Sequence, residues 1–176
     1  MERQELSLDA GDWHGLAVQP RWPSQQVRID AQALAALQRA QARLPAELRL
    51  VLTRAYEEPR ARLGRLRWLS RRLGMALFLL LYPSRRAELR AIFGSNGHDR
   101  NGRHVDVALR WEGRRLRPLP LSVFTPPRWQ QGLARRWAAP LAAARAALEA
   151  EGYTLHSNPT EALQIHADFA GSSWQG

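Results

Sequence analysis

The sequence predicts an α+β fold, with helices packed on one face of a small, mainly antiparallel sheet. Three observations support this prediction. Short segments that alternate apolar and polar residues, typical of strands, are interspersed with longer segments of helical periodicity. The strand-like segments gather in the second half of the chain, which favours a sheet of sequentially adjacent strands. The 176 residues are 45% hydrophobic, which suits one domain with a core and excludes a disordered chain.

The N-terminal part differs in composition from the rest. Residues 1–24 carry Gly, Pro and Trp at close intervals and are expected to be loop-like. We therefore divide the chain into an N-terminal extension, residues 1–26, and a single domain, residues 27–176.

Periodicity places the elements of this domain. Asp30 suits the N-cap of a helix, Pro45 and Pro83 stop helices, and Gly152 suits the position after a helix end. Strands are expected at 27–29, 48–53, 104–111, 115–119, 153–155 and 163–169. Helices are expected at about 31–44, 61–82 (with a possible interruption at Gly74), 87–92 and 129–151.

Composition limits the chemistry. The chain has no cysteine, so any metal site must use His, Asp or Glu. Its 26 basic residues are all Arg, and the net charge is +10. This charge fits either a solvated surface or an anionic partner, such as nucleic acid, a cell-wall polymer or a membrane surface. The Arg residues are scattered and no familiar nucleic-acid motif appears, which favours the solvated surface and no specific nucleic-acid partner.

Membrane and export signals are also absent from the sequence pattern. The first residues are polar and lack the apolar segment of a signal peptide. The longest apolar run, residues 75–82, is far shorter than a bilayer span and suggests a buried helix turn or a docking face. We expect no transmembrane segment, and a protein that is cytoplasmic or exported without a visible signal peptide. The sequence does not predict an oligomeric state.

Histidine and aspartate residues in the second half suggest a metal site. His98 lies in a glycine-rich loop, Asp106 on the strand that follows, and His166 on a late strand. Two imidazoles and one carboxylate leave a fourth position open, which is typical of catalytic zinc. The alternative is that Asp106 pairs with an Arg and that the His residues are solvated or hydrogen-bonded.

His104 shares a strand face with Asp106 because the two residues are two apart. It is a candidate extra ligand, a partner of the ligands or a substrate contact, and the last two interpretations are favoured.

Three segments resemble the D-alanyl-D-alanine dipeptidase and carboxypeptidase family of zinc peptidases. The segment 102–109 resembles the family's G-x-A-x-D-[LV]-x-L, which follows a zinc-binding His. The segment 52–60 resembles a strand ending in D-A-Y-R-P. The segments 152–161 and 165–169 resemble G-F…P-T-E-W-W-H-F-D-F. The matches occur in family order and cover roughly residues 27–170.

The resemblance implies roles for individual residues. Zinc would be bound by His98, Asp106 and His166, with Glu161 as catalytic base and Arg54 as the group that stabilises the oxyanion. The residues expected to assist the ligands or to contact substrate are His104, Tyr56, Arg60 and Gln164. The implied substrate is a peptide of bacterial peptidoglycan that contains D-amino acids.

The chain also departs from the family pattern. His98 and Asp106 are eight residues apart where the family has seven, and Glu161 and His166 are five apart where it has three. The family Arg falls on Glu57. Three hypotheses therefore stand: a zinc peptidase, a degenerate member that acts as a binding or regulatory module, and a basic nucleic-acid-binding protein with seven Trp.

Overall fold

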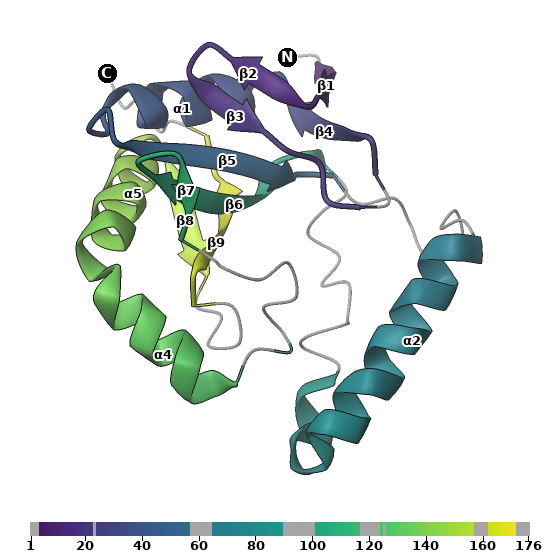
Figure 1. Cartoon of the computed structure of the whole chain (residues 1–176). Helices are drawn as coiled ribbons and strands as arrows, with labels where there is room; N and C mark the ends of the chain where they lie inside the picture. Colours follow the sequence, from purple (N-terminus) through teal and green to yellow (C-terminus); the bar gives the residue numbers. More distant parts are fainter. Residues whose placement is uncertain are drawn as a thin grey trace.

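A computed structural model of the chain describes residues 4–22, 24–56, 65–89, 101–116, 124, 126–156 and 162–171. Within these residues the fold is α+β, with five helices and a mixed, mostly antiparallel sheet of seven strands (Figure 1). The predicted fold class is confirmed at this level.

The seven-stranded sheet brings strands from both halves of the chain together. Only β3 (Leu16–Val18) and β5 (Leu48–Arg54) are parallel among the pairs described, and the short β7 (Arg114–Arg115) pairs with β6 (His104–Trp111) off the main path. A separate antiparallel pair is formed by β1 (Glu5–Asp9) and β4 (Gln26–Asp30). The main sheet runs in the order β2 (Gly11–Trp13), β3 (Leu16–Val18), β5 (Leu48–Arg54), β6 (His104–Trp111), β9 (Gln164–Phe169) and β8 (Tyr153–His156), with β7 at Arg114–Arg115.

The expectation that residues 1–24 are loop-like is wrong, because this segment contains β1, β2 and β3. Strands of three residues are too short to show a periodic pattern, and the glycines between them suggested loops. The turn that joins β2 to β3 uses His14 (φ 54°) and Gly15 (φ 85°), the positive values that a tight hairpin requires. The three residues of β3 are buried in the main sheet beside β5.

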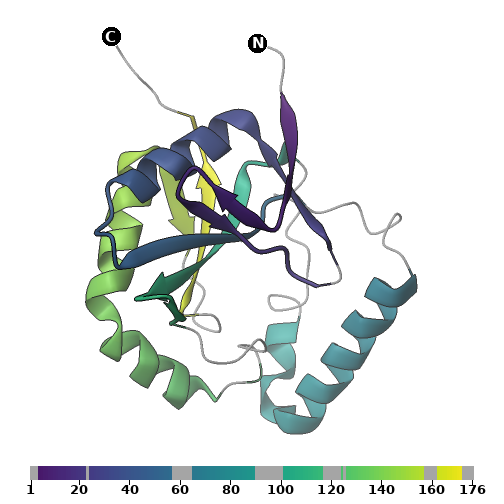
Figure 2. The same ribbon diagram turned by 45° about the horizontal axis from the view of Figure 1, so that its top comes forward.

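The prediction placed the helices on one face of the sheet, and two of the five helices described pack there. They are α1 (Ala31–Ala42) and α5 (Ala138–Ala150), which also contact each other (Figure 2). Asp30 caps α1 as expected, because its side chain accepts hydrogen bonds from the backbone N–H groups of Gln32 and Ala33.

The helix expected at 129–151 is two helices, α4 (Pro127–Arg136) and α5, separated at Trp137 (φ −105°, ψ 24°). The cause is Pro140. A proline inside a helix lacks the N–H donor and clashes with the carbonyl four residues earlier, here that of Arg136. A break at Trp137 moves Pro140 into the first turn of α5, where both penalties disappear.

Helix α2 (Arg65–Leu81) lies apart from the sheet in both views (Figures 1 and 2). It continues through Gly74 without interruption and is followed by the 3₁₀ helix η2 (Pro83–Glu88), whereas residues 90–92 of the helix expected at 87–92 lie outside the described residues. Phe78 is fully buried, whereas Leu80 is 79% exposed, so the apolar run at 75–82 contains both buried and solvent-exposed side chains. Among the described residues, none of the helices has the length and apolarity that a membrane span requires.

The core fills the space between α1, α5 and one face of the sheet. Along β6 and β9, alternate residues face this core: Val105, Val107, Leu109, Ile165, Ala167 and Phe169. The residues between them therefore lie on the opposite face of the same two strands, and these are largely polar.

Candidate metal centre

The polar face carries a row of four side chains across four neighbouring strands. Arg54 on β5 is in register with Asp106 on β6, and Asp106 is in register with His166 on β9. His166 is in turn opposite His156 on β8. Directly opposed residues on antiparallel strands have their Cβ atoms about 4.5–5.5 Å apart, so strand pairing alone brings these groups together.

A second row lies one step along the same face. His104 on β6 is in register with Asp168 on β9. Because His104 is two residues from Asp106, and Asp168 is two residues from His166, both rows project to the same side. The two rows form one cluster of histidine and carboxylate groups on the side away from α1 and α5.

A register shift turns Arg54 toward this cluster. Leu52 is opposite Val107 and faces the core, so simple alternation would point Arg54 toward the core as well. One extra residue on β5, between Leu52 and Arg54, breaks the alternation. The Thr53 hydroxyl donates to the backbone oxygen of Asp106 (2.9 Å), and Arg54 reaches the polar face.

Gly102 fixes the chain just before β6. Its φ is +68°, and a Cβ atom there would lie 2.7 Å from the backbone nitrogen of Asp30. The same Asp30 nitrogen donates a hydrogen bond to the Gly102 oxygen (3.0 Å). Only glycine allows this approach, which ties the start of β6, and hence His104, to the N-cap of α1.

Asp106 is the centre of the inner group, which consists of His104, Asp106 and His166. Its Oδ1 atom lies 2.6 Å from His166 Nδ1 and 3.5 Å from His104 Nε2, and its Oδ2 atom lies 3.0 Å from Arg54 Nε. The Asp106 side chain is 1% exposed, and the side chains of His104 and His166 are 14% and 12% exposed. His104, Asp106 and His166 form a group that could hold a metal ion.

The electrostatics of Asp106 keep it ionised. Burial opposes ionisation of the carboxyl group, but hydrogen bonding to His104 and His166 and the positive charge of Arg54 act in the other direction. Together these interactions hold the pKa of Asp106 well below its usual range. A buried carboxylate that stays negatively charged at neutral pH is a suitable ligand for a cation.

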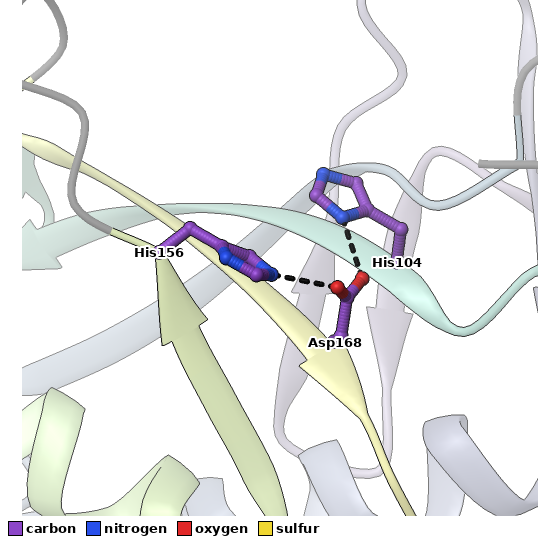
Figure 3. Close-up of side chains that lie close together, drawn as sticks. All are labelled: His104, His156 and Asp168. Atoms are coloured by element: carbon purple, nitrogen blue, oxygen red, sulfur yellow. Dashed lines mark hydrogen bonds and ion pairs between the residues drawn. The ribbon is translucent and has the colours of Figure 1, made fainter. Parts of the chain in front are cut away.

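Asp168 joins two imidazoles on the outer side of the cluster (Figure 3). Its Oδ1 lies 2.8 Å from His104 Nδ1, and its Oδ2 lies 2.6 Å from His156 Nε2. Burial raises the pKa of Asp168, but the hydrogen bonds and charges of the two histidines outweigh it and lower the pKa overall. An ionised Asp168 only accepts, so His104 Nδ1 is the donor to Asp168, and a hydrogen bond from Nε2 to Asp106 uses the second ring nitrogen, whose proton a metal ion bound there would replace.

The donor types of the inner group, two imidazoles and a carboxylate, are ones that zinc can bind, and their donor atoms lie within 4.8 Å of one another. Two donor atoms bound to one zinc ion at about 2.0–2.2 Å lie roughly 3.3 Å apart. The 3.5 Å from Asp106 Oδ1 to His104 Nε2 is close to this value, whereas the 2.6 Å to His166 Nδ1 is that of a hydrogen bond, which an ion would replace. Arg54 contacts the other carboxylate oxygen, and His104 is oriented by Asp168, the arrangement that commonly supports histidine ligands of zinc.

The structure brings together several residues that the sequence singled out. Asp106 contacts both His166 and Arg54. His104 lies beside Asp106 as a third possible metal ligand, with Asp106 and His166. Gln164 is buried on the same face of β9, two residues before His166. The guanidinium carbon of Arg28 lies over the Tyr56 ring, 4.3 Å from the centre of that ring. His98, Arg60 and Glu161 lie outside the described residues, so their predicted roles stay predictions.

Two residues of the cluster were not singled out from the sequence, Asp168 and His156. The signal for Asp168 was present, because the alternation that puts His104 beside Asp106 also puts Asp168 beside His166. His156 could be found only from the register of β8 against β9, which depends on the loop that joins them and has no local sequence signal.

Comparison of the chain with models of known protein families and with curated proteins found no match.

Proposed function

We propose that this chain is a zinc-dependent hydrolase that cleaves peptides containing D-amino acids, of the kind found in bacterial peptidoglycan. The observation that supports it most strongly is the group of Asp106, His166 and His104, two imidazoles around a buried, ionised carboxylate. The substrate class rests on the resemblance to D-alanyl-D-alanine peptidases. In that family, zinc is bound by the segments that resemble those around Asp106 and His166 of this chain.

The donor set favours zinc over other ions. Imidazole nitrogen suits zinc and the later transition metals, whereas magnesium and calcium prefer oxygen donors alone. Asp106 and His166 would be two ligands, and the third would be His104 or, as the resemblance implies, His98. Zinc with three protein ligands lowers the pKa of the water that it binds to about 7, which supplies a nucleophile at neutral pH.

The chain's own residues would prepare and assist this chemistry. Asp168 holds the His104 ring in one tautomer and orientation. Arg54, paired with Asp106 at the edge of the group, carries the positive charge that can stabilise an oxyanion on the substrate carbonyl. Glu161, by resemblance, would accept the proton of the attacking water and pass it to the leaving amine.

The proposal is tested with zinc-loaded protein incubated with D-alanyl-D-alanine and with muropeptides, with released amine as the readout. We expect hydrolysis that chelation abolishes and added zinc restores. His166→Ala should remove activity while circular dichroism shows a folded chain. His14→Asn, which changes an exposed histidine on the β2–β3 turn, should keep full activity. Inactive zinc-loaded wild type, or a fully active His166→Ala variant, would overturn the proposal.

A binding module is the second candidate, because the Arg54–Asp106 ion pair neutralises the buried carboxylate without a metal. Such a protein would bind muropeptides without cleaving them, and chelation would leave the affinity unchanged. Calorimetry with a muropeptide, with and without chelator, separates it from the hydrolase.

A further inference from the structure

The proposed hydrolase leaves one part of the cluster without a direct role. His156, on β8, lies at the outer end of the first row and contacts Asp168 rather than Asp106. His104, His156 and Asp168 form a second group whose donor atoms lie within 4.8 Å of one another (Figure 3). This outer group shares His104 with the inner group and no other residue.

The two imidazoles of the outer group lie on either oxygen of one carboxylate, and the three donor atoms are within 4.8 Å of one another. His104 Nδ1 and His156 Nε2 approach the two oxygens of one carboxylate, at 2.8 and 2.6 Å. Their rings are nearly parallel, with 27° between the planes and 6.0 Å between the centres, and both flank Asp168. An ion bound to this group would have two imidazole nitrogens and a carboxylate as ligands, the donor types of the inner group.

The exposure of the outer group gives an ion a way in. The His156 side chain is 45% exposed and that of Asp168 is 31% exposed, whereas Asp106 is buried. A fourth coordination position would therefore be open to solvent.

We propose that His104, His156 and Asp168 bind a second transition-metal ion, of the class of zinc, cobalt or nickel, beside the inner site. In this arrangement His104 is the shared residue, with Nε2 toward the inner ion and Nδ1 toward the outer one. The outer position depends only on described residues and does not require the chain to be a hydrolase.

The shared ring sets the order of binding. An ion that binds His104 Nδ1 would displace the hydrogen bond between this atom and Asp168. Repulsion between two neighbouring ions would make the half-exposed outer site the weaker one, so it would fill only at excess metal.

The test is metal counting by equilibrium dialysis of the full chain against zinc, with elemental analysis. We expect two equivalents in the wild type and one in His156→Ala, which replaces a half-exposed side chain and should leave the fold intact. His166→Ala should also bind one equivalent, at the outer site. His14→Asn, which removes an exposed histidine far along the sheet, should bind two. Cobalt absorption spectra of the two single-site variants should differ, because their ligands differ.

The outcomes separate this inference from the proposed function. Equal zinc content in the wild type and His156→Ala overturns the outer site. In that case a single ion lost from His166→Ala would still support the inner site. In another outcome, the wild type binds one ion, His156→Ala binds none and His166→Ala still binds one. This result supports the outer site and contradicts the zinc hydrolase.

Discussion

The two faces of strands β6 and β9 differ in almost every property, although their residues alternate along the same chain. Val105, Val107, Ile165 and Ala167 face the helices and are almost fully buried among apolar side chains. His104, Asp106, His166 and Asp168 face the other way and are joined by hydrogen bonds. A strand period of two residues thus lets one segment of chain supply the core and the candidate site together.

The energetic consequences of the two faces are opposite. On the core face, burial of apolar surface contributes about 25 cal/mol per Å² and stabilises the fold. On the site face, Asp106 is a buried charge, which costs free energy unless partners compensate it. Here those partners are Arg54, His104 and His166. We infer that the core face determines stability and that the site face is retained for chemistry.

The sharpest test of this contrast uses two adjacent residues of β9. Ile165→Ala opens a cavity in the core and should lower the free energy of unfolding by about 2–5 kcal/mol, with zinc binding retained in the folded protein. His166→Ala should remove tight zinc binding and change metal-free stability less, since Asp106 keeps Arg54 and His104 as partners. Urea denaturation and zinc titration of both variants provide the measurements. Equal destabilisation by the two changes would contradict the division between faces.

A smaller effect is expected from Asp168→Asn. This change keeps the shape of the side chain but removes the charge that orients His104. Loss of such a partner typically weakens metal binding about 10–100-fold. Competition with a chromophoric chelator at substoichiometric zinc measures the tight site alone. Asp9→Asn, on an exposed position of β1, is the matched control and should have the wild-type affinity. An unchanged affinity in Asp168→Asn would show that His104 is not an inner ligand.

The smallest effect concerns an ion pair within the helix layer, away from the site. Glu151, at the end of α5, bonds Arg39 (2.6 Å) and Arg43 (2.7 Å) at the end of α1. Burial raises the pKa of Glu151, but the two Arg groups outweigh it and lower the pKa below the ordinary value of 4.5. The pair therefore stabilises the fold above that pH, and its contribution is lost as the pH falls through the ordinary value to the lowered one.

Glu151→Gln should cost about 1 kcal/mol at neutral pH, because both Arg side chains are more than half exposed and solvent screens the pair. The difference between wild type and variant should shrink as the pH falls below the ordinary value of 4.5 and through the lowered pKa, where the carboxyl group of the wild type takes up its proton. Urea denaturation at neutral and at acidic pH checks this. A difference that grows in acid would show that Glu151 acts through packing rather than charge.

Much of the fold was predictable from local signals. The strand at His104–Trp111, the cap at Asp30 and the start of α1 all follow from alternation, capping chemistry and periodicity. The short strands near Gly11 and Gly15 were not predictable, because three-residue strands depend on their sheet partners rather than on their own sequence. The break at Trp137 could have been predicted from Pro140.

The candidate site was predictable only in part. Asp106 and His166 were identified from residue type and resemblance, and their contact follows from the pairing of β6 with β9. The contact between Arg54 and Asp106 needs the irregularity at Thr53, which no sequence pattern marks. His156 joins the cluster through β-sheet register, a property of the whole sheet.

The most direct test of the metal centre is anomalous diffraction at the zinc edge from crystals grown with equimolar zinc. We predict a single strong peak about 2.0–2.2 Å from the Asp106 carboxylate and from a ring nitrogen of His166, with a further imidazole as the third ligand. Zinc bound only elsewhere, with the Asp106 carboxylate still paired with Arg54 and His166 alone, would contradict the metal centre.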